Sequence, residues 1–319
     1  MTDEQALTII QRSHARSNVH VQIGPEVILA GPHGTMLESF LQTAITENLI
    51  SLDAPVIAAI SDGELVELSQ PVTKDSYIAP VTLAESDGGR IYRRSLVLLL
   101  AAAVEALWPH TQVSVKFAVR DGGFYCEPLQ RGPFSADELA QIESKMRQLV
   151  AEDLPITKRE VSLDEARQLY AAWGAPIKVR LLDYRDKQTL PLYRLNGYED
   201  YYFGYMVPST RYLQTFKLVN VGRAFILQYP LRDAPTTLHP LRLYKKLSAV
   251  FQQADDWLHK LNVRDIGRLN ALTQTDDIQQ LMLVAEALHE QDIAAIASQI
   301  SIRHANGVRI VLIAGPSSS

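Results

Sequence analysis

Short apolar runs separated by turn residues characterise the first part of the chain. A helical stripe interrupts these runs, and it begins at Thr35 and Glu38, whose spacing is that of a capping box. Asp62 and Gly63 lie between the last two runs and predict a tight hairpin. The runs expected to form strands are residues 19–23, 26–30, 55–60 and 65–68, and the stripe comprises Leu37, Phe40, Leu41 and Ala44.

The order of these elements is strand, strand, helix, strand, strand. Gly24 and Pro25 supply the turn between the first two strands. This order is typical of a ubiquitin-like β-grasp fold, which we expect over residues 18–83.

The region of residues 84–230 mixes helical and strand patterns. Residues 92–108 are apolar on nearly every face and predict a buried helix that ends at Pro109. Two further capping boxes, Ser135 with Glu138 and Ser162 with Glu165, are each expected to open a helix. Strands are expected at residues 113–119, 123–127, 177–182, 192–195, 213–218 and 224–228. This order predicts an α+β fold with an antiparallel sheet.

The third region, residues 231–305, has a helical pattern and is expected to form a helical connector. Its last helix begins near Asp276 and Gln279 and ends at Asn306 and Gly307. Residues 234–237 are rich in Pro and Thr and form the best candidate for a linker.

Composition narrows the class of protein without identifying it. The 319 residues are 47% hydrophobic and 21% charged, with a formal net charge of −5, so no global bias toward nucleic acid or membrane is expected. One cysteine, Cys126, excludes an intramolecular disulfide and fits a reducing cytoplasm. The longest apolar segment, residues 96–108, contains Glu105 and is too short to span a bilayer. We therefore expect a cytoplasmic protein without a membrane partner.

The segment of residues 308–319 consists of an apolar run followed by Gly-Pro-Ser-Ser-Ser. A phosphate-binding loop requires Gly, four free positions and then Gly-Lys-Ser/Thr. The first five positions of such an incomplete loop would be Gly315, Pro316, Ser317, Ser318 and Ser319. Residues 309–314 would then form the buried strand that leads into the loop, and residues 306–319 the start of a kinase domain. The alternative is a flexible tail.

Four stretches of the second region resemble the second N-terminal domain of threonyl-tRNA synthetases. They read RRSLVLL followed by LWPH, then GGFY, and finally YEDYYFGYMV at residues 198–207. The preceding module resembles the TGS domain of these enzymes. This resemblance implies an editing-domain-like fold over residues 84–230.

The editing site of that family consists of a His-x-x-x-His pair and a Cys-x-x-x-His pair. In this sequence Arg94 and Leu98 occupy the first pair, and Tyr202 and Met206 the second. Leu and Met cannot act as a general base, and Arg stays protonated. The resemblance therefore implies that the fold is retained without its hydrolytic chemistry, its zinc ligands or any other metal site, and that these four positions line a degenerate ligand pocket.

The two N-terminal domains, a segment reading VAEALHEQDIAAIA and the final VLIAGPSSS together resemble bacterial uridine kinase-like proteins of the phosphoribulokinase/uridine kinase family. This resemblance implies that ATP and Mg²⁺ serve a complete parent enzyme that phosphorylates uridine or cytidine. The 319 residues would then be an accessory, regulatory region without catalytic residues, and its partner would be its own C-terminal kinase domain.

Two alternatives stay open. The first is that the chain is an RNA- or tRNA-binding module, although Arg180, Arg185, Lys187 and Arg194 are interspersed with acids and predict a solvated face. The second concerns a tyrosine cluster that either lines a pocket for a nucleotide effector, together with Arg93 and Arg94, or simply packs a sheet. The cluster comprises Tyr198, Tyr201, Tyr202, Tyr205 and Tyr212.

Overall fold

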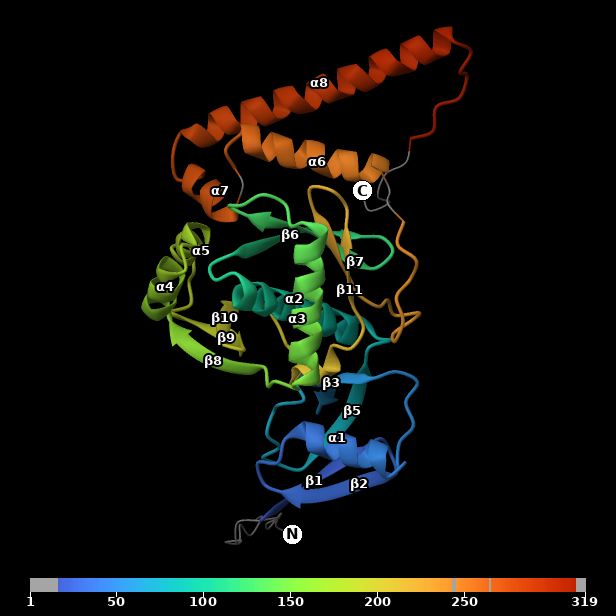
Figure 1. The fold of residues 1–319 in the computed structure, drawn as a ribbon, viewed down its shortest axis with the longest axis vertical. Coiled ribbons are helices and arrows are strands. Elements are labelled where there is room, and N and C mark those ends of the chain that lie inside the picture. Colours follow the sequence, from blue (N-terminus) through green and yellow to red (C-terminus); the bar gives the residue numbers. More distant parts are fainter. Residues whose placement is uncertain (1–16, 243–244, 264, 314–319) are drawn as a thin grey trace, which may run out of the picture. The chain divides into compact units, whose positions relative to one another are not determined.

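The structure is a computed structural model, and it describes residues 17–242, 245–263 and 265–313. Contacts divide the chain into two units. The first runs to Leu163 and continues from Thr189 to Arg242, and the second holds Asp164–Gln188 together with the described residues after Arg242. The first unit mixes helices and strands, whereas the second is helical (Figure 1).

The first module of the first unit is a five-stranded sheet with one helix, which fits the expected β-grasp fold, although its central strand β5 was not predicted. The sheet order is β2-β1-β5-β3-β4, in which β1 and β5 pair in parallel and the other pairs are antiparallel. Asp62 and Gly63 both have positive φ at the β3–β4 turn, which confirms the predicted hairpin. The strands are β1 (Asn18–Ile23), β2 (Val27–Pro32), β3 (Val56–Ser61), β4 (Glu64–Val66) and β5 (Ser76–Thr82).

The helix of this module, α1 (Leu37–Thr46), does not begin with the predicted capping box. Its N-cap is Met36, and the N–H groups of Leu37 and Glu38 donate to backbone carbonyls of residues 70 and 68 instead. The carboxylate of Glu38 accepts hydrogen bonds from Arg211 and Tyr212 of the next module. A tertiary contact has thus replaced the local cap.

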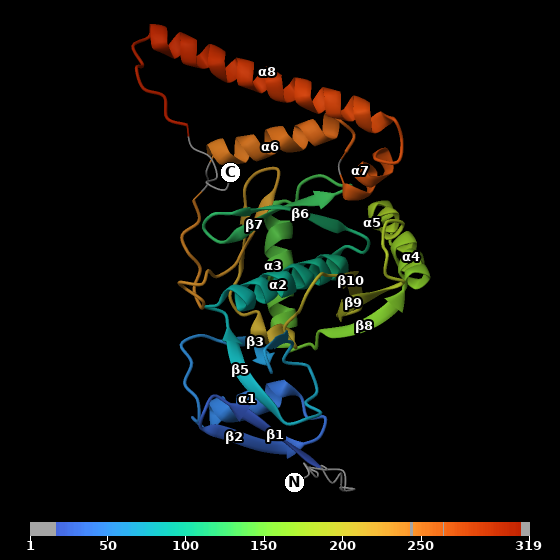
Figure 2. The same cartoon turned by 180° about the vertical axis from the view of Figure 1, so that it is seen from behind.

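The second module contains two antiparallel sheets and two long helices. The four-stranded sheet has the order β11-β12-β7-β6, and α2 and α3 cross beside it (Figures 1 and 2). The capping box at Ser135 and Glu138 is confirmed. These elements are α2 (Ser86–Leu107), β6 (Gln112–Val119), β7 (Gly123–Leu129), α3 (Ala136–Ala151), β11 (Lys217–Asn220) and β12 (Phe225–Gln228).

A smaller antiparallel sheet, in the order β10-β9-β8, completes the module. It contains β8 (Thr157–Ser162), β9 (Thr189–Leu195) and β10 (Tyr198–Tyr201), and a short 3₁₀ helix, η1 (Thr210–Tyr212), follows. β8 was not predicted because its sequence, TKREVS, is polar and buries only Val161. The α+β class with antiparallel sheets is confirmed.

One hydrophobic core joins the two modules. Ile57 and Ala58 of β3 pack with α2, while the other side of the same sheet packs against α1. This double burial explains why β3 is a continuous apolar run rather than an alternating strand. The main core therefore includes side chains from one face of the β-grasp sheet as well as from the helices of the second module.

The second unit is formed by five helices within the described residues. They are α4 (Leu163–Ala172), α5 (Pro176–Leu182), α6 (Lys245–Lys260), α7 (Ile266–Leu272) and α8 (Asp277–Ala305). The strand predicted at residues 177–182 is wrong, because Pro176 occupies the first turn of α5 and favours a helix there. The predicted helical region and its end at Asn306 are confirmed. The domain boundaries predicted after residues 83, 230 and 305 stay predictions.

The strand expected at residues 309–314 is wrong for its described part. Residues 309–313 have no regular structure, and Leu312 and Ile313 are more than 90% exposed. A strand needs a neighbour to satisfy its backbone groups, and none pairs with these residues in the described chain. Residue 314 and the five loop positions that follow it lie outside the described residues. None of the described helices is long and apolar enough to cross a membrane.

Candidate functional site

The predicted editing-like positions meet where α2 contacts the loop of residues 202–207. Nη1 of Arg94 donates to the carbonyl oxygen of Tyr205 at 2.7 Å. At the next residue of α2, Oγ of Ser95 lies 3.3 Å from Sδ of Met206 and accepts a hydrogen bond from the N–H of Val207 at 3.0 Å. The structure therefore brings the two predicted segments together.

The four positions do not share one environment. Leu98 and Met206 are buried, with 0% and 1% of their surface exposed, and both belong to the main core. Tyr202 is half-buried against the same core, and Arg94 is half-buried at its edge. Leu98 and Met206 thus fill the volume in which titratable ligands would stand, and the assignment of all four positions to a ligand pocket stays a prediction.

Gly204 lies close against Arg94. A Cβ atom at Gly204 would stand 2.8 Å from Cζ of Arg94, and the residue has a φ of +101°. Any side chain at this position would be strained and would displace the guanidinium group. The absence of a side chain at residue 204 therefore allows the loop to lie directly on Arg94.

Glu67, from the chain that follows β4 of the first module, reaches into this region. Its Oε1 accepts from the hydroxyl of Tyr193 at 2.6 Å and from the N–H of Met206 at 2.8 Å. The Tyr193 hydroxyl also lies 2.7 Å from the carbonyl oxygen of Gly204. Glu67 and Tyr193 were not among the predicted site residues, because no local pattern relates residues that are 126 positions apart.

Burial shapes the electrostatics of this network. Desolvation lowers the pKa of Arg94 below its ordinary value. Electrostatic interactions with Tyr193 and Glu67 act in the opposite direction and make the decrease smaller. Burial, reinforced by Glu67, raises the pKa of the Tyr193 hydroxyl well above its ordinary value. The phenol is therefore a neutral donor near neutral pH, and neither it nor the guanidinium can take a proton from water.

Aromatic and cationic side chains surround the network on its accessible side. Nζ of Lys158 lies 5.3 Å from the ring centroid of Tyr193 and 5.7 Å from that of Tyr205. Phe203, in the same loop, is 84% exposed. Of the predicted tyrosine cluster, Tyr198, Tyr202, Tyr205 and Tyr212 pack against the main core, as the packing alternative expects. Phe203 stands in the YEDYYFGYMV stretch, but sequence gave no sign of its exposure.

Basic side chains on the small sheet lie further out than their acidic partners. Glu67 and Glu199 expose 13% and 11% of their side chains. Their partners Lys158, Arg159 and Arg194 expose 41%, 42% and 60%. In each of these ion pairs, the basic side chain is thus more exposed to solvent than the carboxylate.

Within the described residues, neither the thiol nor a group of metal-ligating side chains forms a site. Cys126 is buried, and burial raises the pKa of its thiol to about 12, so it is inert as a nucleophile. Within residues 17–242, 245–263 and 265–313, no group of three His, Cys, Asp or Glu side chains could hold a metal ion.

Comparison with known proteins relates the chain to aminoacyl-tRNA synthetases. It is 38% identical to the threonine–tRNA ligase of Burkholderia vietnamiensis over 201 residues, which are 63% of this chain and 31% of the ligase. The identity is also 38% with the ligases of Burkholderia lata, over 165 residues, and of Legionella pneumophila, over 170, each 26% of the ligase. No family model matches.

These relatives correct the functional expectation. The chain spans between a quarter and a third of the length of the ligases that it matches. Because these relatives are ligases, the expectation of an accessory region of a uridine or nucleoside kinase is wrong. The ATP and Mg²⁺ expected for a complete parent enzyme are not tested by this comparison. The alternative that was left open, a module derived from a threonyl-tRNA synthetase, fits them better. More than half of this chain is homologous to part of the threonine–tRNA ligases.

Proposed function

We propose that this chain is an RNA-binding module that engages tRNA or a single-stranded part of it, without hydrolysing it. The observation that carries this proposal is the exposure of Phe203 within an aromatic loop that lies beside Lys158 and Arg94. The threonine–tRNA ligases to which the chain is similar act on tRNA by name, which supports the choice of RNA as the ligand.

Covering an exposed aromatic ring removes apolar surface from water, which is favourable. Phe203 offers a flat face of this kind, and an unpaired base can stack on such a face with little sequence preference. Stacking of one base on an aromatic side chain contributes about 1–3 kcal/mol. The loop therefore supplies affinity for unpaired bases.

The charges around the loop suit a phosphate backbone. Lys158, Arg159 and Arg194 expose their cationic ends, whereas Glu67 and Glu199 lie mostly below the surface. A polyanion would therefore meet the basic ends first, and it would release counterions on binding. This arrangement of exposed basic side chains is local, whereas the chain as a whole carries a formal net charge of −5.

The positions that match the family's editing ligands favour binding over catalysis. Leu98 and Met206 carry no group that can transfer a proton, and the Arg94 guanidinium donates to the Tyr205 carbonyl. The loop is instead held in place by hydrogen bonds to Arg94, Ser95 and Glu67. A fixed loop loses little conformational freedom when RNA binds.

Fluorescence anisotropy with labelled tRNA and with a short single-stranded RNA tests the proposal. Phe203→Ala should weaken binding by about 5- to 150-fold, which is the value of one stacked base. Lys158→Gln should reduce the slope of log K against log salt by about 0.7–1. The matched control is Ile28→Ala, which removes a 62% exposed apolar side chain of β2. Absence of RNA binding at low salt, or an unchanged affinity in Phe203→Ala, would refute the proposal.

A further inference from the structure

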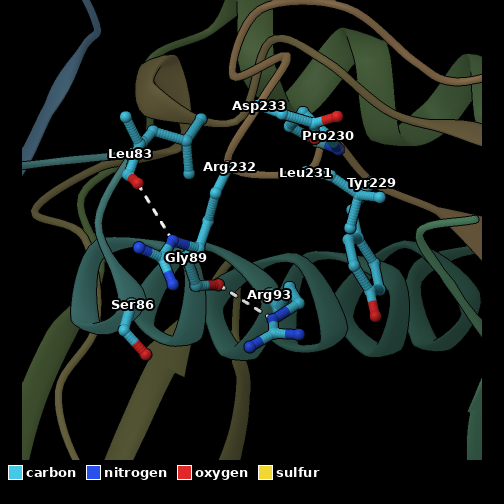
Figure 3. A pocket seen from close by; sticks show the side chains of 10 residues that line it. Leu83, Ser86, Gly89, Arg93, Tyr229, Pro230, Leu231, Arg232 and Asp233 are labelled. Atoms are coloured by element: carbon cyan, nitrogen blue, oxygen red, sulfur yellow. Dashed lines mark hydrogen bonds between the residues drawn. The ribbon is translucent and has the colours of Figure 1, made fainter. Parts of the chain in front are cut away.

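A second concave site lies at the start of α2, away from the aromatic loop. It is a pocket of about 530 Å³, a size typical of small-ligand sites. Apolar and polar side chains share its lining, and in Figure 3 Arg232 and Arg93 lie between Leu83 and Tyr229. The apolar residues used below are Leu83, Tyr229 and Leu231, and the polar ones are Ser86, Arg93 and Arg232.

Both arginines are held by backbone carbonyl groups through their Nε atoms. Nε of Arg93 donates to the carbonyl oxygen of Gly89 at 3.0 Å, and its guanidinium carbon lies 5.3 Å from the ring centroid of Tyr229. Nε of Arg232 donates to the carbonyl oxygen of Ala84 at 3.1 Å (Figure 3). These contacts orient each guanidinium group and leave its terminal nitrogens for another partner.

Two acidic side chains near the pocket contact side chains other than Arg93 and Arg232. Asp87 lies 3.2 Å from Nη1 of Arg90, and Asp233, which also lines the pocket, lies 3.2 Å from Nε2 of His239. Within the described part of the chain, neither Arg93 nor Arg232 forms an ion pair with a carboxylate. The pocket therefore contains two oriented cations whose charge is not neutralised by a salt bridge.

We propose that this pocket binds a phosphate monoester, with Arg93 and Arg232 on the phosphoryl oxygens. A guanidinium group presents parallel N–H donors that match phosphate oxygens, and two such cations balance the two charges of a monoester. The hydroxyl of Ser86, which also lines the pocket, is a further donor, and Leu83 and Leu231 offer contact to the uncharged part of the ligand. This inference does not depend on RNA binding by the aromatic loop.

A phosphate monoester of this kind has two sources, namely a free nucleotide and the terminal phosphate of an RNA chain. Isothermal titration of the full chain with inorganic phosphate, adenosine monophosphate and adenosine measures the first. A pair of short RNAs that differ only in a 5′-phosphate or a 5′-hydroxyl group measures the second. Adenosine and the 5′-hydroxyl RNA are the matched ligands without a monoester.

Variants identify the pocket. Arg232→Ala should weaken the binding of the monoester about tenfold or more, and Arg232→Lys should recover only part of it, since it keeps the charge and loses the paired donors. Arg93→Gln should act in the same direction. Arg223→Ala removes an exposed arginine from the β11–β12 turn and should leave binding unchanged. Thermal unfolding of each variant shows whether its fold is intact.

Monoester binding that depends on Arg232 supports the proposal, and the responding ligand identifies its source. Failure of phosphate, nucleotide and 5′-phosphorylated RNA to bind at millimolar concentration would overturn it. Binding that is unchanged in both Arg232→Ala and Arg93→Gln would overturn it as well. Phe203→Ala should have no effect on monoester binding, so a failure here is distinguishable from a failure of the RNA-binding proposal.

Discussion

Oε1 of Glu67 lies 2.6 Å from the hydroxyl oxygen of Tyr193, although the two residues belong to different modules. The same oxygen accepts from the N–H of Met206 at 2.8 Å. One carboxylate thus fixes both the small sheet and the loop that carries Phe203. The β-grasp module is therefore part of the architecture of the candidate RNA site.

Removal of this carboxylate should destabilise the protein. Glu67→Ala leaves the Met206 N–H and the Tyr193 hydroxyl without their acceptor, so the free energy of unfolding should fall by about 2–4 kcal/mol. Urea denaturation measures the change. Glu64→Ala, in the exposed part of the same hairpin, should change stability by less than about 0.5 kcal/mol. Equal effects of the two substitutions would contradict the role given to Glu67.

Glu199 should contribute a pH-dependent part of the stability. The hydrogen bond and charge of Arg159 hold the pKa of Glu199 below its ordinary value of 4.5. A carboxyl whose pKa is lower in the folded state stabilises the fold above its unfolded pKa. This stabilisation is lost as pH falls below about 4.5 and through the folded pKa.

Unfolding curves between pH 7 and pH 3 test this dependence. Glu199→Gln should reduce stability at pH 7 and flatten its decrease below about pH 4.5. Glu47→Gln, an exposed carboxyl on the turn after α1, serves as the control and should follow the unmodified protein. Parallel curves for Glu199→Gln and the unmodified protein would show that the ion pair contributes nothing.

Leu98 should behave as a core residue. It is fully buried on α2, so Leu98→Ala leaves a cavity and should cost about 2–5 kcal/mol of stability. Leu49→Ala, at a position that is 44% exposed, should cost far less. Chemical denaturation of the pair decides the matter. A small loss in Leu98→Ala would mean that residue 98 faces an open pocket instead.

Cys126 should resist alkylation until the chain unfolds. With a pKa of about 12, only about one thiol in ten thousand is ionised at pH 8. Because the chain has one cysteine, iodoacetamide labelling read by mass spectrometry reports on this residue alone. Labelling should be slow in buffer and rapid in urea. Rapid stoichiometric labelling of the folded protein would disprove the burial of this thiol.

Several local patterns led to the observed elements. The Ser135 and Glu138 capping box opens α3, and the Asp62-Gly63 turn joins β3 to β4, because both signals act over a few residues. The pattern failed at residues 177–182, where apolar β-branched residues suggested a strand but Pro176 begins a helix. It also failed at Thr35, because Glu38 binds Arg211 rather than its own helix start.

The sequence by itself determined the α+β class and four of the five β-grasp strands, since these follow from local spacing and residue chemistry. The resemblance to threonyl-tRNA synthetases implied that editing ligands are absent at residues 94, 98, 202 and 206. Only the tertiary structure decided that Leu98 and Met206 fill the core, that Phe203 is exposed and that Arg93 and Arg232 share a pocket. Exposure and contact between distant residues depend on how the elements pack. Arg93 and Arg232 line one pocket because the segment after β12 lies against the start of α2, where Arg232 donates to the Ala84 carbonyl, and no local periodicity records that contact.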